Sequence, residues 1–447
     1  MIQCFPNKAK TTIGSVLFML ISGLSCISCS KDSDSEPKGT YDSNYGLYVI
    51  DDGQDIYEKG DSYSAFNDTE EMIGKALNDY AVRMLIDYGN DNENALLSPI
   101  SASVLYSMMA NFTDDNASNS FQEGMGISNY SMRDINSYCR KLMYRENTSG
   151  ENLTIQNNVW INNNSSVYNS FLSMAKMYKA KVKGIEFGST AGNTAMNNSI
   201  GNKMKNVDIS KKSSWDGVNM AVTSSMYLEK KWKKKMTVSS TKYEFVNIDG
   251  SIYEGKMLIS TQYARYANYH NFDILEIPYE GADYCLYIVY PHESGLLKQS
   301  LQELNTVGFV TCINTMKEEK VDIRIPKFKC EGLIDLNPSG KAAKAEIKNL
   351  FQTKLPKVSP SGFSLSDVYQ ACSMELNQEG MSVSVESSGI EVDISEFIGT
   401  TPGSGSSSET PKSKEFLINH PFAIFFRSSK LGVIVYGSCI KNINNIE

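Results

Sequence analysis

After the N-terminal segment, the chain takes on the pattern of a globular domain. In the first part of this region, apolar residues recur at helical spacing. Between residues 72 and 85 they fall on one helical face, and the pattern ends at Gly89. A second helix is predicted after Ser98-Pro99, because proline is favoured in the first turn of a helix. The early part of the chain is therefore predicted to be helical.

Further along, the apolar residues form alternating or continuous runs of strand length. The runs span residues 153–161, 220–228, 274–277, 285–290, 321–325, 423–426 and 432–437. Helices concentrated early and strands late indicate an α+β fold. Since no internal repeat or interior linker is present, we expect a single domain over residues 63–445.

One segment breaks the globular pattern. Residues 399–414 contain no large apolar side chain, although strand patterns lie on both sides of them. Such a composition cannot bury enough surface to offset the entropy lost on ordering, so an exposed loop is expected. A long loop between buried strands is a common place for a binding function.

Composition excludes several classes of function. The 447 residues include 43 Lys and Arg against 51 Asp and Glu, a net charge of −8, which argues against nucleic-acid binding. The three histidines, His270, His292 and His420, form no i,i+4 pair, and the cysteines beyond the leader have no CxxC spacing. No GxSxG motif is present. The sequence therefore predicts no metal, no cofactor and no enzyme.

The N-terminus has the pattern of a targeting segment. Lys8 and Lys10 precede an apolar run over residues 13–24, which is too short to cross a bilayer of about 30 Å. The residues up to Cys29, and the acidic stretch after it, resemble the signal of a bacterial surface lipoprotein of the Bacteroidetes type. We expect residues 1–28 to be a signal peptide, Cys29 to be acylated, and residues 29–62 to be a flexible tether.

Two alternatives to this interpretation remain open. Cys26 is a second possible anchor, and an ordinary secretory signal cleaved nearby would leave no lipid. The lipoprotein interpretation predicts that the protein is an outer-membrane lipoprotein of the cell envelope, exposed at the surface, with the lipid as its only membrane contact.

Eight short motifs follow one another between about residues 66 and 442. They lie at residues 78–85, 96–101, 157–161, 221–232, 275–281, 325–328, 377–380 and 419–422. Their order and spacing resemble those of the serpin family of serine protease inhibitors. The resemblance implies a fold of three β-sheets and about eight to nine helices, with an exposed reactive loop at about residues 380–415.

The resemblance also implies a function. Inhibitors of this family are suicide substrates: a serine protease cleaves the loop and becomes acylated, and the freed loop inserts as a strand into the central sheet. The expected partner is a serine protease, with cysteine proteases as a further class, and the protein is expected to be a monomer. The alternative is a non-inhibitory serpin-fold binding lipoprotein.

The start of the loop has a pattern suited to insertion. After Gly380, the residues Met381, Val383 and Val385 alternate with polar ones, as a strand with one buried face requires. They are bulkier than the small residues usual in the family hinge, and Gln378 stands where glutamate is usual. After Ser388-Gly389 the apolar positions shift by one residue, so continued insertion would need a bulge there.

Two positions where the sheet is expected to open also depart from the family pattern. Ser224 stands where asparagine is usual, and Gln370 where histidine is usual. Because serine and glutamine can both donate and accept, the contact between them can be rebuilt. Ser98 and Ser101, in the motif that opens the second helix, are assigned to the same region.

The family spacing from Gly380 places the reactive bond at Ile394-Ser395, with Phe397 as the second choice. No Lys or Arg lies between Met381 and Thr410. Elastase-, chymotrypsin- or subtilisin-like proteases are therefore expected targets rather than trypsin-like ones. The sequence does not identify the protease.

Overall fold

A computed structural model describes residues 40–42, 46–49, 64–89, 92–146, 153–200, 218–281, 283–336, 354–360, 362–364, 367–385 and 413–443. The chain divides into two units, Met1–Glu36 and Pro37–Glu447, and every described residue belongs to the second. Among the described helices, none has both the length and the apolar run that a membrane crossing requires.

Eight helices occur in the described part of the chain. The first begins with a capping box, in which the Asn67 side chain accepts a hydrogen bond from the Glu70 amide and the Glu70 carboxylate accepts one from the Asn67 amide. Every residue of the second is buried, in keeping with its uncharged sequence. The helices are α1 (Asp68–Tyr88), α2 (Pro99–Ala110), α3 (Asp115–Met125), α4 (Met132–Glu146), α5 (Asn169–Met177), α6 (Thr190–Ile200), α7 (Leu297–Val307) and α8 (Phe309–Thr315).

The first sheet has eight strands in the order β1-β2-β5-β4-β6-β16-β15-β12. Several neighbours in this order, such as β6 and β16, come from distant parts of the sequence, so the sheet depends on long-range pairing. Its strands are β1 (Thr40–Asp42), β2 (Leu47–Val49), β4 (Leu153–Asn162), β5 (Lys181–Ile185), β6 (Met220–Lys231), β12 (Phe328–Asp335), β15 (Asp367–Leu376) and β16 (Gly380–Val385).

The second sheet has nine strands, in the order β17-β11-β8-β9-β10-β18-β19-β3 with β7 paired to β8, and β13 and β14 form a small third sheet. The strands of these two sheets are β3 (Ala95–Leu97), β7 (Thr237–Val246), β8 (Ile252–Asn268), β9 (Phe272–Pro278), β10 (Tyr284–Pro291), β11 (Lys317–Pro326), β13 (Lys354–Leu355), β14 (Phe363–Ser364), β17 (Lys414–Leu417), β18 (Phe422–Ser428) and β19 (Val433–Ile440).

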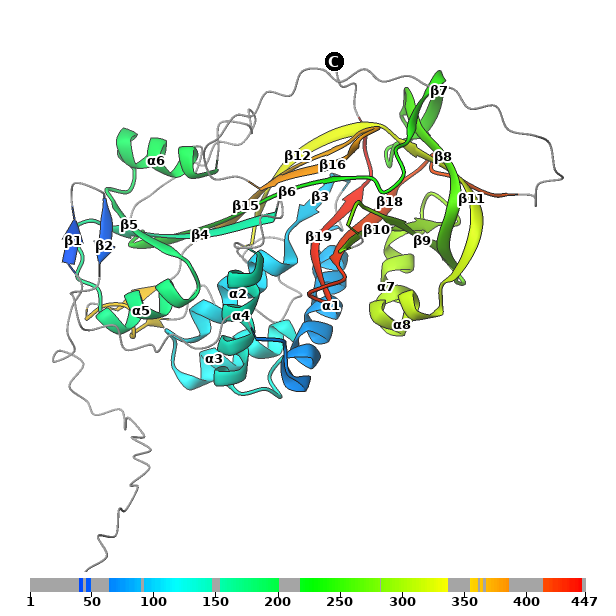
Figure 1. The fold of residues 1–447 in the computed structure, drawn as a ribbon. Helices are drawn as coiled ribbons and strands as arrows, with labels where there is room; N and C mark the ends of the chain where they lie inside the picture. Colours follow the sequence, from blue (N-terminus) through cyan, green and yellow to red (C-terminus); the bar gives the residue numbers. More distant parts are fainter. Residues whose placement is uncertain are drawn as a thin grey trace, which may run out of the picture. The chain divides into compact units, whose positions relative to one another are not determined.

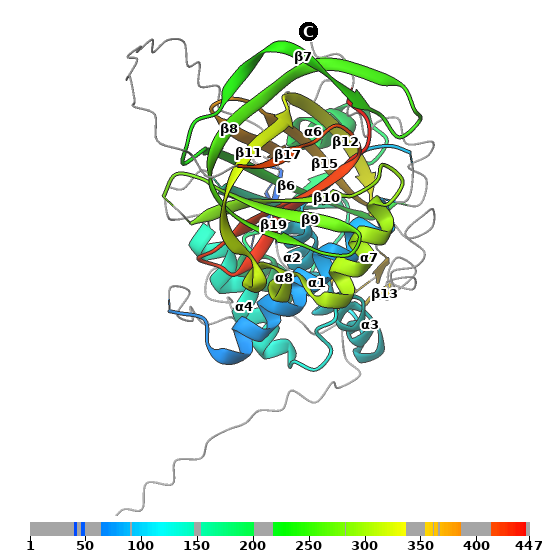
Figure 2. The same cartoon turned by 90° about the vertical axis from the view of Figure 1, so that its right-hand side faces the viewer.

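Helices cover both sheets. Helices α1 to α4 lie on one side of the first sheet and α6 on the other (Figure 1). Helices α7 and α8 lie against the second sheet (Figure 2). The buried helix α2 contacts β4, β6 and β19, so the core is shared by the two large sheets. The predicted α+β fold with three sheets is confirmed, with eight helices in the described residues.

Candidate functional site: the hinge strand in the first sheet

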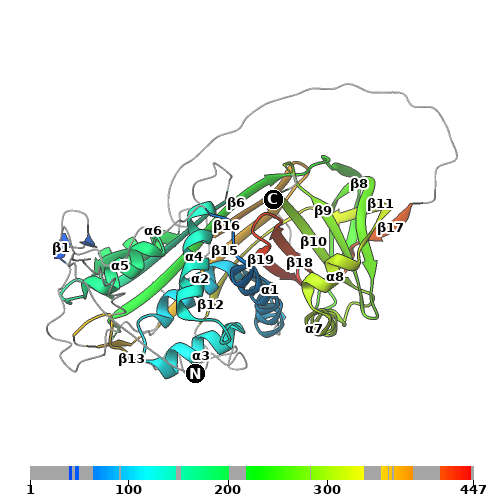
Figure 3. The same ribbon diagram turned by 60° about the horizontal axis from the view of Figure 1, so that its bottom comes forward.

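The first six residues of the predicted loop form a strand inside the first sheet. The strand β16 pairs antiparallel with β6 on one side and with β15 on the other, and Figure 3 shows it between them. We expected the loop to be exposed from Gly380 onward. The structure differs because the alternating apolar residues at its start already fill a gap between β6 and β15.

A tight turn connects β15 to β16. The Asn377 amide donates to the Gly380 carbonyl at 3.0 Å, and the Asn377 side-chain oxygen accepts from the amides of Glu379 at 3.0 Å and Gly380 at 3.1 Å. Asparagine favours such turns because its side chain bonds its own backbone. We call Asn377–Gly380 the hinge turn.

Glycine is required at the end of the hinge turn. A Cβ atom at Gly380 would lie 1.9 Å from the carbonyl oxygen of Lys230, and 2.8 Å from the Cα of Lys231. Gly380 pairs with Lys231 as the first residue of β16, so the two backbones approach more closely than a side chain allows.

Trp232 holds the hinge turn from the end of β6. Its backbone amide donates to the Glu379 carbonyl and its indole Nε1 donates to the Asn377 carbonyl, both at 2.9 Å. The indole ring stacks on Tyr279, with ring centroids 4.6 Å apart. Since Trp232 is 2% exposed, these bonds are shielded from water. Two groups of Trp232, the backbone amide and the indole Nε1–H, thus fix where β16 begins.

Two apolar residues of β16, Met381 and Val383, face the core. Met381 and Val383 are buried, and Val383 lies between Leu228 of β6 and Met374 of β15, which are also buried. Val385 ends the strand opposite Met226. Gln378 lies in the hinge turn, and its buried side-chain oxygen has no hydrogen-bond partner within the described residues.

Beyond the end of β16, its two neighbours pair directly with each other. Residues Ala221–Ser224 of β6 pair in parallel with Asp367–Gln370 of β15. Gln370 and its partner Ser224 are 146 positions apart in the sequence. Met374 and Leu228, which face each other across Val383 of β16, are also 146 positions apart. The two outer strands therefore keep one register whether they are paired directly or through β16.

Gln370 is fixed to the start of α2. Its side-chain oxygen accepts from the Ser98 amide at 2.7 Å, and its side-chain nitrogen donates to the Ser98 carbonyl at 3.1 Å. The Ser98 hydroxyl donates to Val435 at 3.0 Å and lies 2.8 Å from the Ser101 hydroxyl. Backbone pairing places Ser224 beside Gln370, and the described hydrogen bonds of the Gln370 side-chain amide go to the backbone of Ser98.

The chain returns to the second sheet after the loop. Strand β17 pairs in parallel with β11, and the Asn419 carbonyl accepts from the Val246 amide at 2.8 Å. His420 stacks on Tyr290, with ring centroids 4.4 Å apart, and burial lowers its pKa. The predicted reactive-bond residues Ile394, Ser395 and Phe397 lie outside the described residues, as does Cys29.

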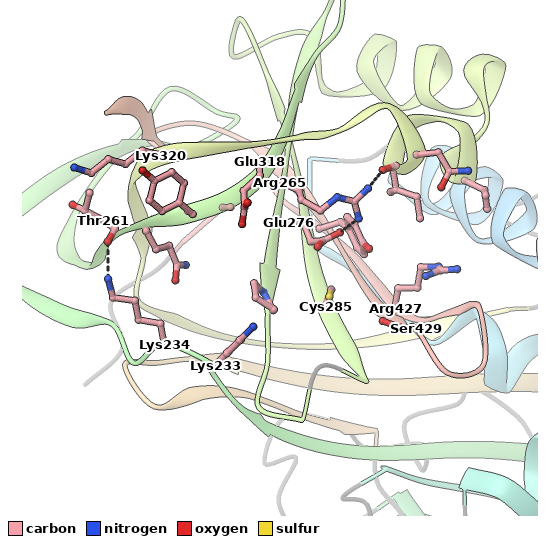
Figure 4. A pocket seen from close by; sticks show the side chains of 18 residues that line it. Lys233, Lys234, Thr261, Arg265, Glu276, Cys285, Glu318, Lys320, Arg427 and Ser429 are labelled. Carbon is pink, nitrogen blue, oxygen red and sulfur yellow. Dashed lines mark hydrogen bonds and ion pairs between the residues drawn. The ribbon is translucent and has the colours of Figure 1, made fainter. Parts of the chain in front are cut away.

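A pocket of about 910 Å³ lies on the second sheet, beside the residues that follow Trp232 (Figure 4). Five cationic side chains line it, against two carboxylates. They are Lys233, Lys234, Arg265, Lys320 and Arg427, with Glu276 and Glu318.

Some of these charges are already paired. Arg265 forms an ion pair with Glu276 at 2.8 Å, and Lys234 donates to the Thr261 carbonyl at 2.7 Å. The buried Nε of Arg427 has no hydrogen-bond partner in the described part of the chain. Burial raises the pKa of Cys285, which lines this pocket, to about 11, so its thiol stays neutral at physiological pH. The pocket therefore offers positive charge rather than a nucleophile.

One contact in the site was not predicted from the sequence. Trp232 and Asn377 belong to recognised motifs, but their contact across 145 positions was not expected. No group of three or more metal-ligating side chains occurs among the described residues.

Comparison with known proteins gives one family. The profile of the family described as serpin (serine protease inhibitor) matches residues 75–441. Mouse neuroserpin is 24% identical over 373 residues, covering 79% of this chain and 87% of neuroserpin.

Solved structures give the same fold. The native state of tengpin, a thermophilic serpin, matches with a TM-score of 0.71 at 18% identity, covering 85% of this chain and 96% of tengpin. Human thyroxine-binding globulin, solved in complex with thyroxine, matches with a TM-score of 0.68 at 16% identity, covering 84% of this chain and all of the globulin.

Proposed function

Since the chain belongs to the serpin family, we propose that it inhibits serine proteases as a suicide substrate, with residues 380–415 as its reactive loop. The observation that carries this proposal is the position of β16. A strand already lies between β6 and β15. Beyond the end of this strand, β6 and β15 pair directly with each other in the register that further insertion needs. The start of the loop is thus joined to the sheet that would receive the rest.

The proposed chemistry is acyl transfer followed by insertion. The protease serine oxygen attacks the carbonyl carbon of residue 394, and the peptide bond to residue 395 breaks as its nitrogen takes a proton. An ester then joins the protease to Ile394. Insertion of the freed strand adds backbone hydrogen bonds and buries apolar side chains, which stabilises the product. Trapping requires that insertion is faster than hydrolysis of the ester.

The loop sequence favours proteases with apolar specificity pockets. Ile394 and Phe397 suit elastase-, chymotrypsin- or subtilisin-like enzymes, and cysteine proteases form a further class. The acidic residues Glu391, Asp393 and Glu396 favour basic clefts.

The test compares two lysine substitutions on opposite faces of β16. Val383→Lys places a charge on the buried face, whereas Ser382→Lys places it between Glu229 and Glu375 on the other face. Each protein is incubated with elastase, chymotrypsin and subtilisin and run on denaturing gels. Wild type and Ser382→Lys should form a denaturant-resistant complex, and Val383→Lys should be cleaved without one. Absence of any complex with wild type would overturn the inhibitor proposal.

We also propose that a lipid on Cys29 holds the protein at the cell envelope, facing outward. Cys29→Ala should release it from membranes in cell fractionation, and Cys26→Ala should not. The reverse result would move the anchor to Cys26, and release by neither substitution would contradict lipidation.

The pocket on the second sheet supports a second candidate, a non-inhibitory binding protein. Its excess of cations would favour an organic anion with an apolar body, and thyroxine, the ligand of the globulin with the same fold, is a suitable probe. Arg427→Gln should weaken thyroxine binding, measured by calorimetry, about tenfold or more, since a hydrogen bond to a charged group contributes about 1.5–3 kcal/mol. Arg133→Gln, on the exposed face of α4, is the matched control. Absence of binding to wild type would exclude this probe as a ligand.

A further inference from the structure

Strand β7 forms an edge of the second sheet. It pairs with β8 on one side, and no other strand of the described part of the chain pairs with it. Figure 2 shows β7 as the outermost strand of this sheet, at the top of the view. The outer edge of a strand offers backbone amides and carbonyls to another strand.

One hydrogen bond shows which residues of β7 point to the open edge. The Val246 amide donates away from β8, to the Asn419 carbonyl at 2.8 Å. In an antiparallel pair, the amide and carbonyl of one residue point to the same side, and the side alternates along the strand. Lys242 and Glu244 therefore direct their backbone groups to the open edge, where these groups have no hydrogen-bond partner among the described residues.

The exposed face of β7 and β8 carries charges in pairs of like sign. Lys242 lies directly opposite Lys256, and Glu244 lies directly opposite Glu254. None of these four side chains takes part in an ion pair within the described residues. Since like charges in opposed positions destabilise a strand pair, an adjacent strand with the complementary charges would be favourable.

We propose that β7 pairs antiparallel with β7 of a second copy of this chain, about a two-fold axis at Tyr243. Lys242 then lies opposite Glu244 of the second copy, and Glu244 lies opposite its Lys242. At both positions the backbone groups face each other, so each residue donates one hydrogen bond and accepts one. The same surface serves both copies, as a two-fold dimer requires.

The order of the charges selects a second copy and one register. Charged residues at a sheet edge often prevent pairing, and a row of one sign would do so here. The sign instead changes between Lys242 and Glu244, so an antiparallel strand of the same sequence is complementary when Tyr243 is the centre. A shift of two residues would bring Glu244 opposite Glu244, or Lys242 opposite Lys242.

The paired segment is short. At one end the Val246 amide is already bonded to Asn419, and at the other the pairing with β8 is irregular between Val238 and Lys242. We therefore expect a weak dimer that forms at high protein concentration. It would replace the monomer expected from the sequence.

The first test uses the two-fold axis. Tyr243→Cys places two cysteines directly opposite each other, at a position where the side chains of an antiparallel pair approach most closely. A mild oxidant should then convert the full-length protein to a disulfide-linked dimer on non-reducing gels. Lys242→Cys, which faces residue 244 of the second copy rather than itself, should form much less dimer, and wild type gives the background.

The second test exchanges the charges and measures the dissociation constant by sedimentation equilibrium. Glu244→Lys brings lysines opposite each other at both symmetry-related positions and should raise the dissociation constant about tenfold or more. The double variant Lys242→Glu/Glu244→Lys restores the complementarity and should restore the wild-type value. Glu123→Lys, at an exposed position of α3, makes the same change of net charge and should have little effect. Thermal midpoints check that each variant folds.

The other outcomes would overturn the dimer. These are absence of a wild-type dimer at every soluble concentration, equal cross-linking of the two cysteine variants, and a dimer whose dissociation constant is the same in all charge variants. If Tyr243→Cys is cross-linked in whole cells to a protein of different mass, the edge binds another partner and the second copy is wrong. These results leave the proposed inhibition untouched, because β7 is not part of the reactive loop.

Discussion

The ammonium group of Lys141 lies 2.7 Å from the carboxylate of Glu70, and both side chains are buried, 9% and 1% exposed. Glu70 also accepts from the Ser137 hydroxyl at 2.7 Å, and Lys141 donates to the Ala65 carbonyl at 3.1 Å. The pair therefore joins α4 to the start of α1. Each charge has more than one partner, as a buried ion pair requires.

Removing the cation should be strongly destabilising. In Lys141→Met the Glu70 carboxylate stays buried without its positive partner, and we expect a loss of about 3–5 kcal/mol in the free energy of unfolding. Lys75→Met, at an exposed position of α1, should change little. Denaturant titration measures both. Equal stability of the two variants would mean that Glu70 gains access to water when Lys141 is absent.

The same pair predicts a dependence on pH. Burial acts to raise the pKa of Glu70, but hydrogen bonds from Lys141, the Asn67 amide and Ser137 outweigh it and lower the pKa below 4.5. Ionised Glu70 thus stabilises the folded state at pH above 4.5, and this stabilisation is lost as the pH falls through the lowered pKa. In thermal scans from pH 7 to pH 3, Glu70→Gln should lose less stability on acidification than wild type does.

Gly380→Ala should displace the start of β16. The added methyl group would meet the Lys230 carbonyl, which is backbone and cannot turn away. We expect faster amide hydrogen exchange over residues 380–385, measured by mass spectrometry. Gly295→Ala, where the structure leaves open space, is the control and should not change exchange. Unchanged exchange in Gly380→Ala would mean that β6 moves to accommodate the methyl group.

Trp232→Phe keeps an aromatic ring on Tyr279 but removes the bond from Nε1 to the Asn377 carbonyl. The loss should be about 0.5–1.5 kcal/mol and local to the hinge turn. Hydrogen exchange should increase at residues 377–380 and remain unchanged in α2. A uniform increase across the protein would instead indicate global destabilisation.

Gln370→Leu removes the acceptor of the buried Ser98 amide. An unsatisfied buried donor costs about 1–3 kcal/mol, so the thermal midpoint of the intact protein should fall. Gln370→Glu retains an acceptor for that amide. At low pH, where its carboxyl group is neutral, the thermal midpoint of Gln370→Glu should fall less than that of Gln370→Leu. The comparison is made by thermal scans at pH 4 and pH 7.

Much of the fold could be predicted because its motifs are local. The capping pattern at Ser98-Pro99 and the alternation of Met381 and Val383 can be read from a few adjacent residues. Alternation predicts that one face of a strand is buried, but not which strands lie beside it. The presence of β16 between β6 and β15 before any cleavage depends on a gap formed by residues about 150 positions apart, and no local pattern describes it.

The pocket illustrates the same limit. Its cations come from the residues after β6, from β8, from β11 and from the end of β18. No local pattern in the sequence marks any one of these cations as part of a site. They become a group only when the pairing order of the second sheet brings these strands together.

The position of β16 has a kinetic consequence. Adding a strand to a sheet resembles helix formation, in which the first turn is slow to nucleate and later residues add quickly. Here the first six residues are already paired on both sides, and the flanking strands keep one register throughout. After cleavage, each new residue would only exchange a direct β6–β15 contact for two contacts of its own. Insertion would therefore begin as propagation, with the nucleus already present in the uncleaved protein.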